Sequence, residues 1–172
     1  MKLVIQPDAK HAEGLVASLI AKALREKPSL VLGLATGRTM EPVYKDLVRM
    51  HREEGLDFSL CRTFNLDEYI GLPPDHPGSY RYYMDHHLFN HINIDKRNTF
   101  LPDGMAEDIP ASCLCYEERM EACGGVDLQL LGIGADGHIG FNEPLSALGS
   151  RTRDISLDPS TLAVNSKLFK NP

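Results

Sequence analysis

The segment 130–144, with the sequence LLGIGADGHIGFNEP, follows an apolar run and contains glycines at positions 132, 134, 137 and 140. The apolar run predicts a buried strand, and the glycines predict a loop at its end. Glycine adopts backbone conformations that other residues avoid, so such a loop can hold side chains at fixed angles beside a ligand. Its titratable residues, Asp136, His138 and Glu143, make this loop the first candidate for a catalytic site.

Two interpretations of these three side chains stay open from the residues alone. A histidine held by carboxylates can move a proton near neutral pH, because a carboxylate fixes its tautomer and raises its basicity. An Asp-Gly-His sequence can equally be a polar turn with a solvated histidine. A metal site is not predicted, because no second histidine or cysteine lies nearby at ligand spacing.

The composition is typical of a soluble globular protein, with 172 residues of which 42% are hydrophobic and 24% charged. A net charge of −6 gives no overall support for binding nucleic acid or an acidic membrane. No apolar stretch approaches the roughly 18 residues that span a bilayer, and the N-terminus does not resemble a signal peptide. The four cysteines include no CxxC pair. We therefore expect a single cytoplasmic domain over residues 1–172, without nucleic-acid or membrane partners.

Apolar runs alternate with helical patterns along the chain. Strands are predicted over residues 2–6, 29–34, 61–66, 98–101, 126–131 and 153–157. Helices are predicted over residues 8–27, 40–54, 79–90 and 111–123. This alternation predicts a three-layer α/β/α fold, Rossmann-like, with a mostly parallel sheet and right-handed crossovers.

A second candidate site is the loop Thr36-Gly37-Arg38-Thr39, between a predicted strand and a predicted helix. The first amides of a helix are unpaired and lie at the positive end of its dipole, so they can bind a phosphate together with the two threonine hydroxyls. Arg38 can add a charge-assisted hydrogen bond. A helix capped by threonine, with no ligand, explains the same residues.

A third candidate is Asp67, directly after the predicted strand 61–66. Ligands of open α/β sheets bind beyond the carboxyl ends of the strands, so Asp67 is expected at the same edge as Thr36 and His138. It is then a candidate base, although a helix cap or a surface acid would also fit.

Taken together, four stretches resemble the glucosamine-6-phosphate deaminase family. They are LATGRT at 34–39, FNLDEYIGL at 64–72 followed by HPGSY at 76–80, GIGADGHIGFNEP at 132–144, and SRTR at 150–153. The resemblance implies an enzyme of amino-sugar catabolism, classed as a hydrolase or isomerase, that uses neither a metal nor an organic cofactor. Its reaction would convert glucosamine 6-phosphate and water to fructose 6-phosphate and ammonium.

The resemblance also implies a role for each candidate residue. His138, supported by Asp136 and Glu143, would open the sugar ring by moving a proton at the ring oxygen. Asp67 would then take the C2 proton and return it at C1, while the loop from Thr36 to Thr39 would bind the phosphate. This fits general chemistry, because a proton shift between adjacent carbons needs one carboxylate close to both, and ring opening needs a separate group.

Several positions depart from the family pattern. Arg38 replaces a small residue and Met40 replaces a proline in the phosphate loop. Residues 157–172 match the start of the active-site lid, where Lys167 replaces an arginine and keeps its charge without the bidentate fork.

Effector binding by the route of some bacterial members is not expected. Ser146 and Arg153 match residues of the site for N-acetylglucosamine 6-phosphate, but Ala147 and Ile155 do not. Family members also continue beyond the lid, so we expect either a partial copy or a homo-oligomer in which a neighbouring chain covers the apolar faces.

Three alternatives to the deaminase remain. A 6-phosphogluconolactonase shares the fold and the Gly-x-Asp-Gly-His loop, but it lacks the FN-x-DEY element. A sugar-phosphate-binding domain without turnover would not need Asp67, His138 and Glu143 together. An inactive fragment could keep every motif while its phosphate site is incomplete.

Overall fold

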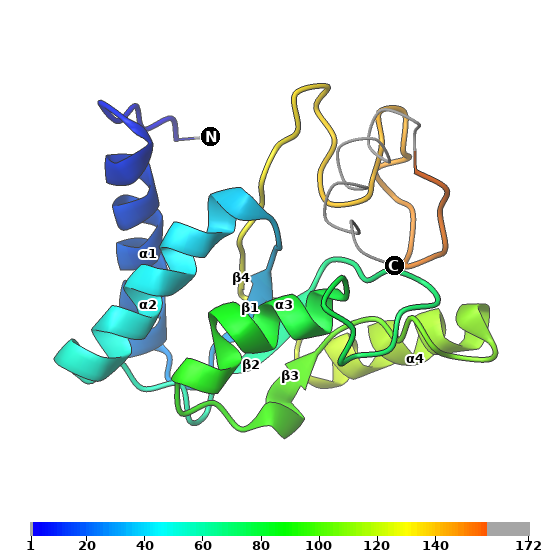
Figure 1. The fold of residues 1–172 in the computed structure, drawn as a ribbon, viewed down its shortest axis with the longest axis horizontal. Coiled ribbons are helices and arrows are strands. Elements are labelled where there is room, and N and C mark those ends of the chain that lie inside the picture. Colours follow the sequence, from blue (N-terminus) through cyan, green and yellow to red (C-terminus); the bar gives the residue numbers. More distant parts are fainter. Residues whose placement is uncertain (1, 158–172) are drawn as a thin grey trace.

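The computed structural model describes residues 2–157. Their sheet has four strands in the order β3-β2-β1-β4, and every pairing is parallel (Figure 1). The strands are β1 (Val31–Leu34), β2 (Arg62–Asn65), β3 (Thr99–Phe100) and β4 (Leu128–Gln129). In register, Leu32 of β1 pairs with Thr63 of β2 and with Leu128 of β4. The predicted parallel sheet is confirmed.

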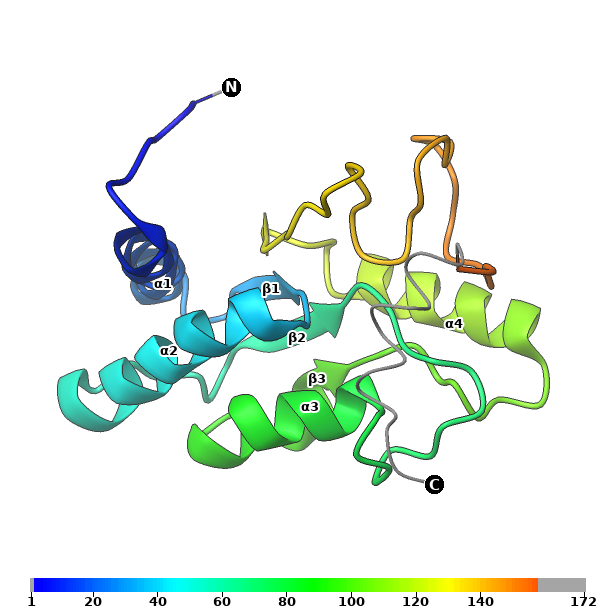
Figure 2. The ribbon, with the colours of Figure 1, turned by 45° about the horizontal axis from the view of Figure 1, so that its top comes forward.

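Helices cover both faces of this sheet (Figure 2). They are α1 (Ala9–Glu26), α2 (Glu41–Glu54), α3 (Tyr80–His87) and α4 (Ile109–Ala122), with short 3-10 turns at Arg38–Met40, Phe89–His91 and Lys96–Asn98. On one face, Leu32 and Leu34 pack in a core shared with α1, α2 and α3. On the other face, Val31 and Phe64 pack against Tyr116 of α4. These two cores make the three layers expected from the sequence.

Local signals explain where the helices begin and end. Asp8 caps α1 by accepting a hydrogen bond from the His11 amide at 2.9 Å, and Asp108 does the same for α4. Gly55, with φ of 68°, ends α2 in the left-handed conformation that glycine adopts at low cost.

Two predicted strands are absent, because residues 2–6 and 153–157 are not strands. The other four are shorter than predicted, most of all β4, which was predicted over 126–131. An extended segment counts as a strand only where a neighbour offers a hydrogen-bonding ladder, and apolar residues alone do not supply one. Leu3 and Ile5, for example, are 78% and 85% exposed.

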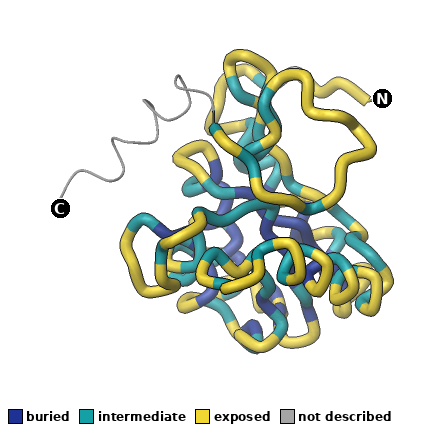
Figure 3. The backbone as a smooth tube through the Cα atoms, turned by 90° about the vertical axis from the view of Figure 1, so that its right-hand side faces the viewer, coloured by how far each residue is buried: buried dark blue, intermediate teal, exposed yellow. Residues whose placement is uncertain are grey.

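Buried residues concentrate on the strands and the helices that pack on them, whereas residues 117–157 include no buried residue (Figure 3). Among the helices of the described chain, none combines the length and apolar character that a membrane span requires.

Candidate active site

The loops that follow β1, β2 and β4 meet at one edge of the sheet (Figures 1 and 2). Since β1 lies between β2 and β4, its loop is flanked by the other two. The loop after β4 touches the end of β2, because a Cβ at Gly140 would lie only 2.8 Å from Oδ2 of Asp67. It also touches the 3-10 turn after β1, since a Cβ at Gly132 would lie 3.1 Å from Cε of Met40. The three sequence candidates therefore lie on adjacent loops.

Asp67 occupies an enclosed position just beyond β2. Part of its surface stays accessible, but burial raises the pKa of its carboxyl to about 7, and the neighbouring Glu68 carboxylate adds to the rise. A hydrogen bond from the Phe141 amide opposes this effect without cancelling it. A carboxyl with a pKa near neutrality can accept and return a proton, as a general base must.

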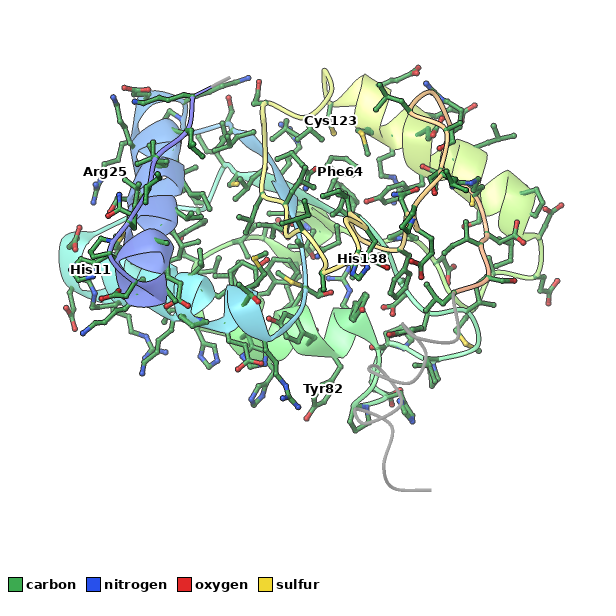
Figure 4. The ribbon with its side chains drawn as sticks, turned by 90° about the horizontal axis from the view of Figure 1, so that it is seen from above. His11, Arg25, Phe64, Tyr82, Cys123 and His138 are labelled. Carbon is green, nitrogen blue, oxygen red and sulfur yellow. The ribbon has the colours of Figure 1, made fainter. Side chains whose placement is uncertain are left out.

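His138 and Asp136 form a pair at the tip of the loop after β4. Nδ1 of His138 lies 2.7 Å from Oδ1 of Asp136, and the same oxygen accepts a hydrogen bond from the His138 amide at 3.2 Å. This amide is the main reason that the pKa of Asp136 is lowered. The carboxylate contact leaves Nε2 as the nitrogen for a substrate. Seen from above, His138 lies over the middle of the molecule (Figure 4).

Glycine 134 is required for the position of the His138 ring. A Cβ at Gly134 would lie 2.2 Å from Cε1 of His138, so no other residue fits while the ring keeps this place. The Gly134 amide also donates to the His138 carbonyl at 2.9 Å. Gly134, one of the glycines of this loop, therefore supports the His138 ring by close backbone approach.

Glu143 completes the cluster, since one polar atom each of Asp136, His138 and Glu143 lie within 4.8 Å of one another. Among residues 2–157, these three side chains form a group that could share a cation. The donor set holds a single histidine whose Nδ1 already faces a carboxylate, so a proton-transfer group describes it better.

The loop after β1 is held by tyrosines from two helices. The Tyr44 hydroxyl of α2 donates to the Ala35 carbonyl, and the Tyr83 hydroxyl of α3 donates to the Gly37 carbonyl at 2.8 Å. Thr36 is hydrogen-bonded to Tyr80. These bonds draw loop carbonyls toward the helices.

The threonine cap considered for α2 is absent. Helix α2 begins after Met40, and neither it nor the 3-10 turn Arg38–Met40 receives a side-chain cap from the described residues. Residues 37–39 are exposed. The structure thus keeps the uncapped amides and exposed side chains that an anion-binding loop needs.

An aromatic cluster joins the loops after β2 and β4 to α3, and sequence reasoning did not assign it to the site. The ring centroids of Tyr69 and Phe141 are 4.9 Å apart, and those of Tyr80 and Phe141 are 5.5 Å apart. Tyr69 and Phe141 each lie within two residues of a candidate acid, which was the available signal.

A cavity of about 650 Å³ opens on the α4 side of Asp67, lined also by Tyr116 and Arg153. The predicted phosphate loop, His138 and Glu143 do not line it. Arg153 donates to Oγ of Ser150 at 3.0 Å, while the amide of Ser146 donates to the Glu143 carbonyl at 3.0 Å. The two predicted effector residues therefore have different partners, and Lys167 lies outside the described residues.

Comparisons with known proteins show which family the chain is similar to. A family model described as "Glucosamine-6-phosphate isomerases/6-phosphogluconolactonase" matches residues 8–141. A glucosamine-6-phosphate deaminase of Thermoanaerobacter sp. (strain X514) is 48% identical over 171 residues, which are 99% of this chain and 68% of that relative. One of Arthrobacter sp. (strain FB24) is 53% identical over 99% of this chain and 66% of its own length.

Among solved structures, the chain is more similar to a deaminase than to a lactonase of that family. A monomeric glucosamine-6-phosphate deaminase has a TM-score of 0.96 and 42% identity, covering 99% of this chain and 70% of that one. The 6-phosphogluconolactonase of Thermotoga maritima has a TM-score of 0.65 and 25% identity, covering 81% and 62%. This chain therefore belongs to the family of glucosamine-6-phosphate isomerases and 6-phosphogluconolactonases, and its similarity is greater to the deaminases.

Proposed function

We propose that this chain is an isomerase-type enzyme that converts glucosamine 6-phosphate to fructose 6-phosphate and ammonium. The observation that carries the proposal is the pairing of two different proton-transfer groups at one sheet edge. Asp67 is enclosed and has a raised pKa, whereas His138 is more open and lies against Asp136. The reaction needs two such groups, one at the ring oxygen and one between two carbons.

His138 acts first in this proposal. Its Nε2 is the nitrogen not facing Asp136, and it moves a proton from the C1 hydroxyl to the ring oxygen. The C1–O5 bond then breaks and leaves an open-chain aldehyde. Asp136 holds the imidazole during this transfer, and Glu143 lies close enough to assist.

Asp67 acts on the open chain. Its carboxylate removes the proton from C2, and the electron pair left behind forms a double bond between C1 and C2. The aldehyde oxygen takes up a proton from the ammonium group of the substrate, which gives an enolamine. The same carboxyl returns the proton to C1, which gives an imine at C2. Water adds there and ammonia leaves, so the product is the 2-ketose. A single base serves both carbons because C1 and C2 are adjacent.

The loop Thr36-Gly37-Arg38-Thr39 is the proposed phosphate site. Its exposed residues and uncapped amides can bind an anion, and the guanidinium of Arg38 adds a positive charge. Lys167 is a proposed second cation from the lid.

Hydrolysis of a lactone is the second candidate, because the family includes it. Lactone hydrolysis breaks no C–H bond, so it does not need an enclosed carboxyl such as Asp67. A domain that only binds sugar phosphates would gain nothing from burying a carboxyl at the cost of its ionisation. The site therefore favours the deaminase and not the hydrolase class.

The test is ammonium release and fructose 6-phosphate formation from glucosamine 6-phosphate by the 172-residue chain. Asp67→Asn and His138→Gln should each lose most activity, while Glu107→Gln, at an exposed acid far along the chain from the loops, should keep it. Turnover of 6-phosphogluconolactone in place of the amino sugar would contradict the proposal.

A further inference from the structure

Glu68 follows Asp67 directly, and its carboxylate is occupied by backbone amides. Oε1 accepts hydrogen bonds from the amides of Tyr69 and Tyr80, both at 2.8 Å. Oε2 accepts one from the amide of Arg81 at 2.9 Å. One side chain thus satisfies three backbone donors, two of which are 12 and 13 residues away.

Two of those donors are the first amides of α3. The third helix amide, that of Tyr82, donates to Oγ of Ser79 at 3.0 Å. Glu68 therefore accepts from the first two amides of α3 and Ser79 from the third. The helix dipole favours a carboxylate at this end. Ser79 is the ordinary local cap, whereas Glu68 reaches the helix from the end of β2.

The opposite side of the segment is fixed by a backbone contact. A Cβ at Gly104 would lie 2.1 Å from the Tyr69 carbonyl oxygen and 3.4 Å from Cγ of Glu68. The Gly71 amide donates to the Gly104 carbonyl at 2.8 Å. The residues after Asp67 are therefore held between α3 and the loop at Gly104.

We propose that Glu68 is a positioning residue for the reaction. It fastens the end of β2 to α3 so that Asp67 keeps its place, and it sets a fixed negative charge beside the Asp67 carboxyl. The catalytic part of this inference rests on the proposed function. The position that Glu68 gives to Asp67 and the charge that it places nearby do not depend on that function.

Burial is the main reason that the pKa of Asp67 is raised, and the charge of Glu68 adds to the rise. Three helices face Asp67 with phenols, and burial raises the pKa of each well above its usual range, so they stay neutral. They are Tyr44 of α2, Tyr80 of α3 and Tyr116 of α4. The loop after β4 contributes the Phe141 amide, three residues beyond His138 and two before Glu143. Removal of the charge on Glu68 should therefore lower the pKa of Asp67.

Glu68→Gln is the test, because it keeps the shape and removes the charge. The Gln amide nitrogen cannot accept the Arg81 amide, so one bond to α3 is also lost. We expect kcat to fall about tenfold or more with KM within about twofold, since positioning affects the transition state more than binding. The acidic limb of the kcat profile should move to lower pH.

Two further variants separate charge from capping. Ser79→Ala removes the neighbouring cap of the same helix and leaves the charge, so it should lower Tm without moving the acidic limb. Glu68→Asp keeps the charge on a shorter side chain that does not reach both amides of α3, so kcat should fall while the limb stays in place. If Glu68→Gln does not fold, parent-like kcat in Glu68→Asp overturns the proposal.

Carbon-13 titration of the Asp67 carboxyl provides a readout that does not depend on turnover. In Glu68→Gln this titration should move to lower pH, and an unchanged titration together with parent-like kcat would overturn the inference. If the parent is folded but does not act on glucosamine 6-phosphate, the proposed function fails, while the titration still decides the role of Glu68.

Discussion

Asp67 and Asp136 lie in contrasting regions of the same site. Asp67 follows a buried strand in a segment fastened on both sides, and burial raises the pKa of its carboxyl to about 7. Asp136 lies on an exposed loop, and hydrogen bonds from His138 lower its pKa. The two aspartates therefore differ in pKa: Asp67 can exchange a proton near neutral pH, whereas Asp136 stays a carboxylate.

The supports of the two regions differ in kind. The end of β2 is held by long-range hydrogen bonds, such as those that the first amides of α3 donate to the Glu68 carboxylate. The loop after β4 is held by short-range bonds within itself, such as that between Gly134 and His138, in a stretch without buried residues. Contacts with distant segments therefore support Asp67, whereas contacts within one loop support His138.

Asp67→Asn should have the largest effect on activity, because it removes the ionisable group of the enclosed region. Without a base at C2 we expect kcat to fall by roughly 10³-fold or more. The activity of the parent should itself fall below a pH of about 7, where Asp67 becomes protonated.

The same variant should change the pH dependence of stability. Because the folded-state pKa is raised, the parent loses stability as pH rises from the ordinary carboxyl pKa of 3.8 to about 7, on the order of 2 kcal/mol between pH 5 and 8. Asn does not ionise, so the Tm of Asp67→Asn relative to the parent should increase with pH. An equal difference at both pH values would show that Asp67 is not enclosed in solution.

His138→Gln should give the next largest effect, a loss of kcat of roughly 10²-fold, because a ring can open slowly without the imidazole. Ring opening should then limit the rate. A substrate deuterated at C2 should therefore show a smaller isotope effect in this variant than in the parent. An undiminished isotope effect would place His138 in the same step as Asp67.

Gly140 and Gly137 offer a matched pair for the contact between the two regions. Both have positive φ, 58° and 93°, so alanine should cost each about 1 kcal/mol of stability. Only a Cβ at Gly140 meets Asp67, at 2.8 Å from Oδ2, while nothing lies within 4 Å at Gly137. Gly140→Ala should lower kcat about tenfold and Gly137→Ala only slightly. Equal losses would mean that strain, and not the contact, matters.

Much of this arrangement could be predicted from sequence because it depends on local patterns. The apolar run at 29–34 and the helical pattern over 8–27 predicted β1 and α1 to within two residues at each end. The strand ends placed Asp67 and His138 on the same edge. In contrast, the predicted strand at 2–6 was wrong, because a ladder partner is not a local property.

The parts of the site that sequence did not reveal are contacts between distant segments. Glu68 appeared only as the neighbour of Asp67, and its bonds to α3 depend on how the chain folds back after the loop at 71–78. Tyr116 lies 49 residues after Asp67 in the sequence (116 − 67), yet the two side chains line the same cavity and interact electrostatically. Spacing alone carries no signal for such contacts.

The smallest effect should come from Tyr83→Phe. This variant tests whether the loop after β1 binds phosphate without affecting the regions of Asp67 and Asp136. The hydroxyl that bonds to the Gly37 carbonyl is removed, and a single hydrogen bond contributes about 1 kcal/mol. Neither Asp67 nor His138 loses a partner in this change, so we expect inorganic phosphate to inhibit about threefold less strongly and kcat to stay unchanged. Tyr82→Phe is the matched control, since its hydroxyl on the same helix bonds to no described residue. A fall in kcat in Tyr83→Phe alone would show that the phosphate loop also helps to position the reacting carbons.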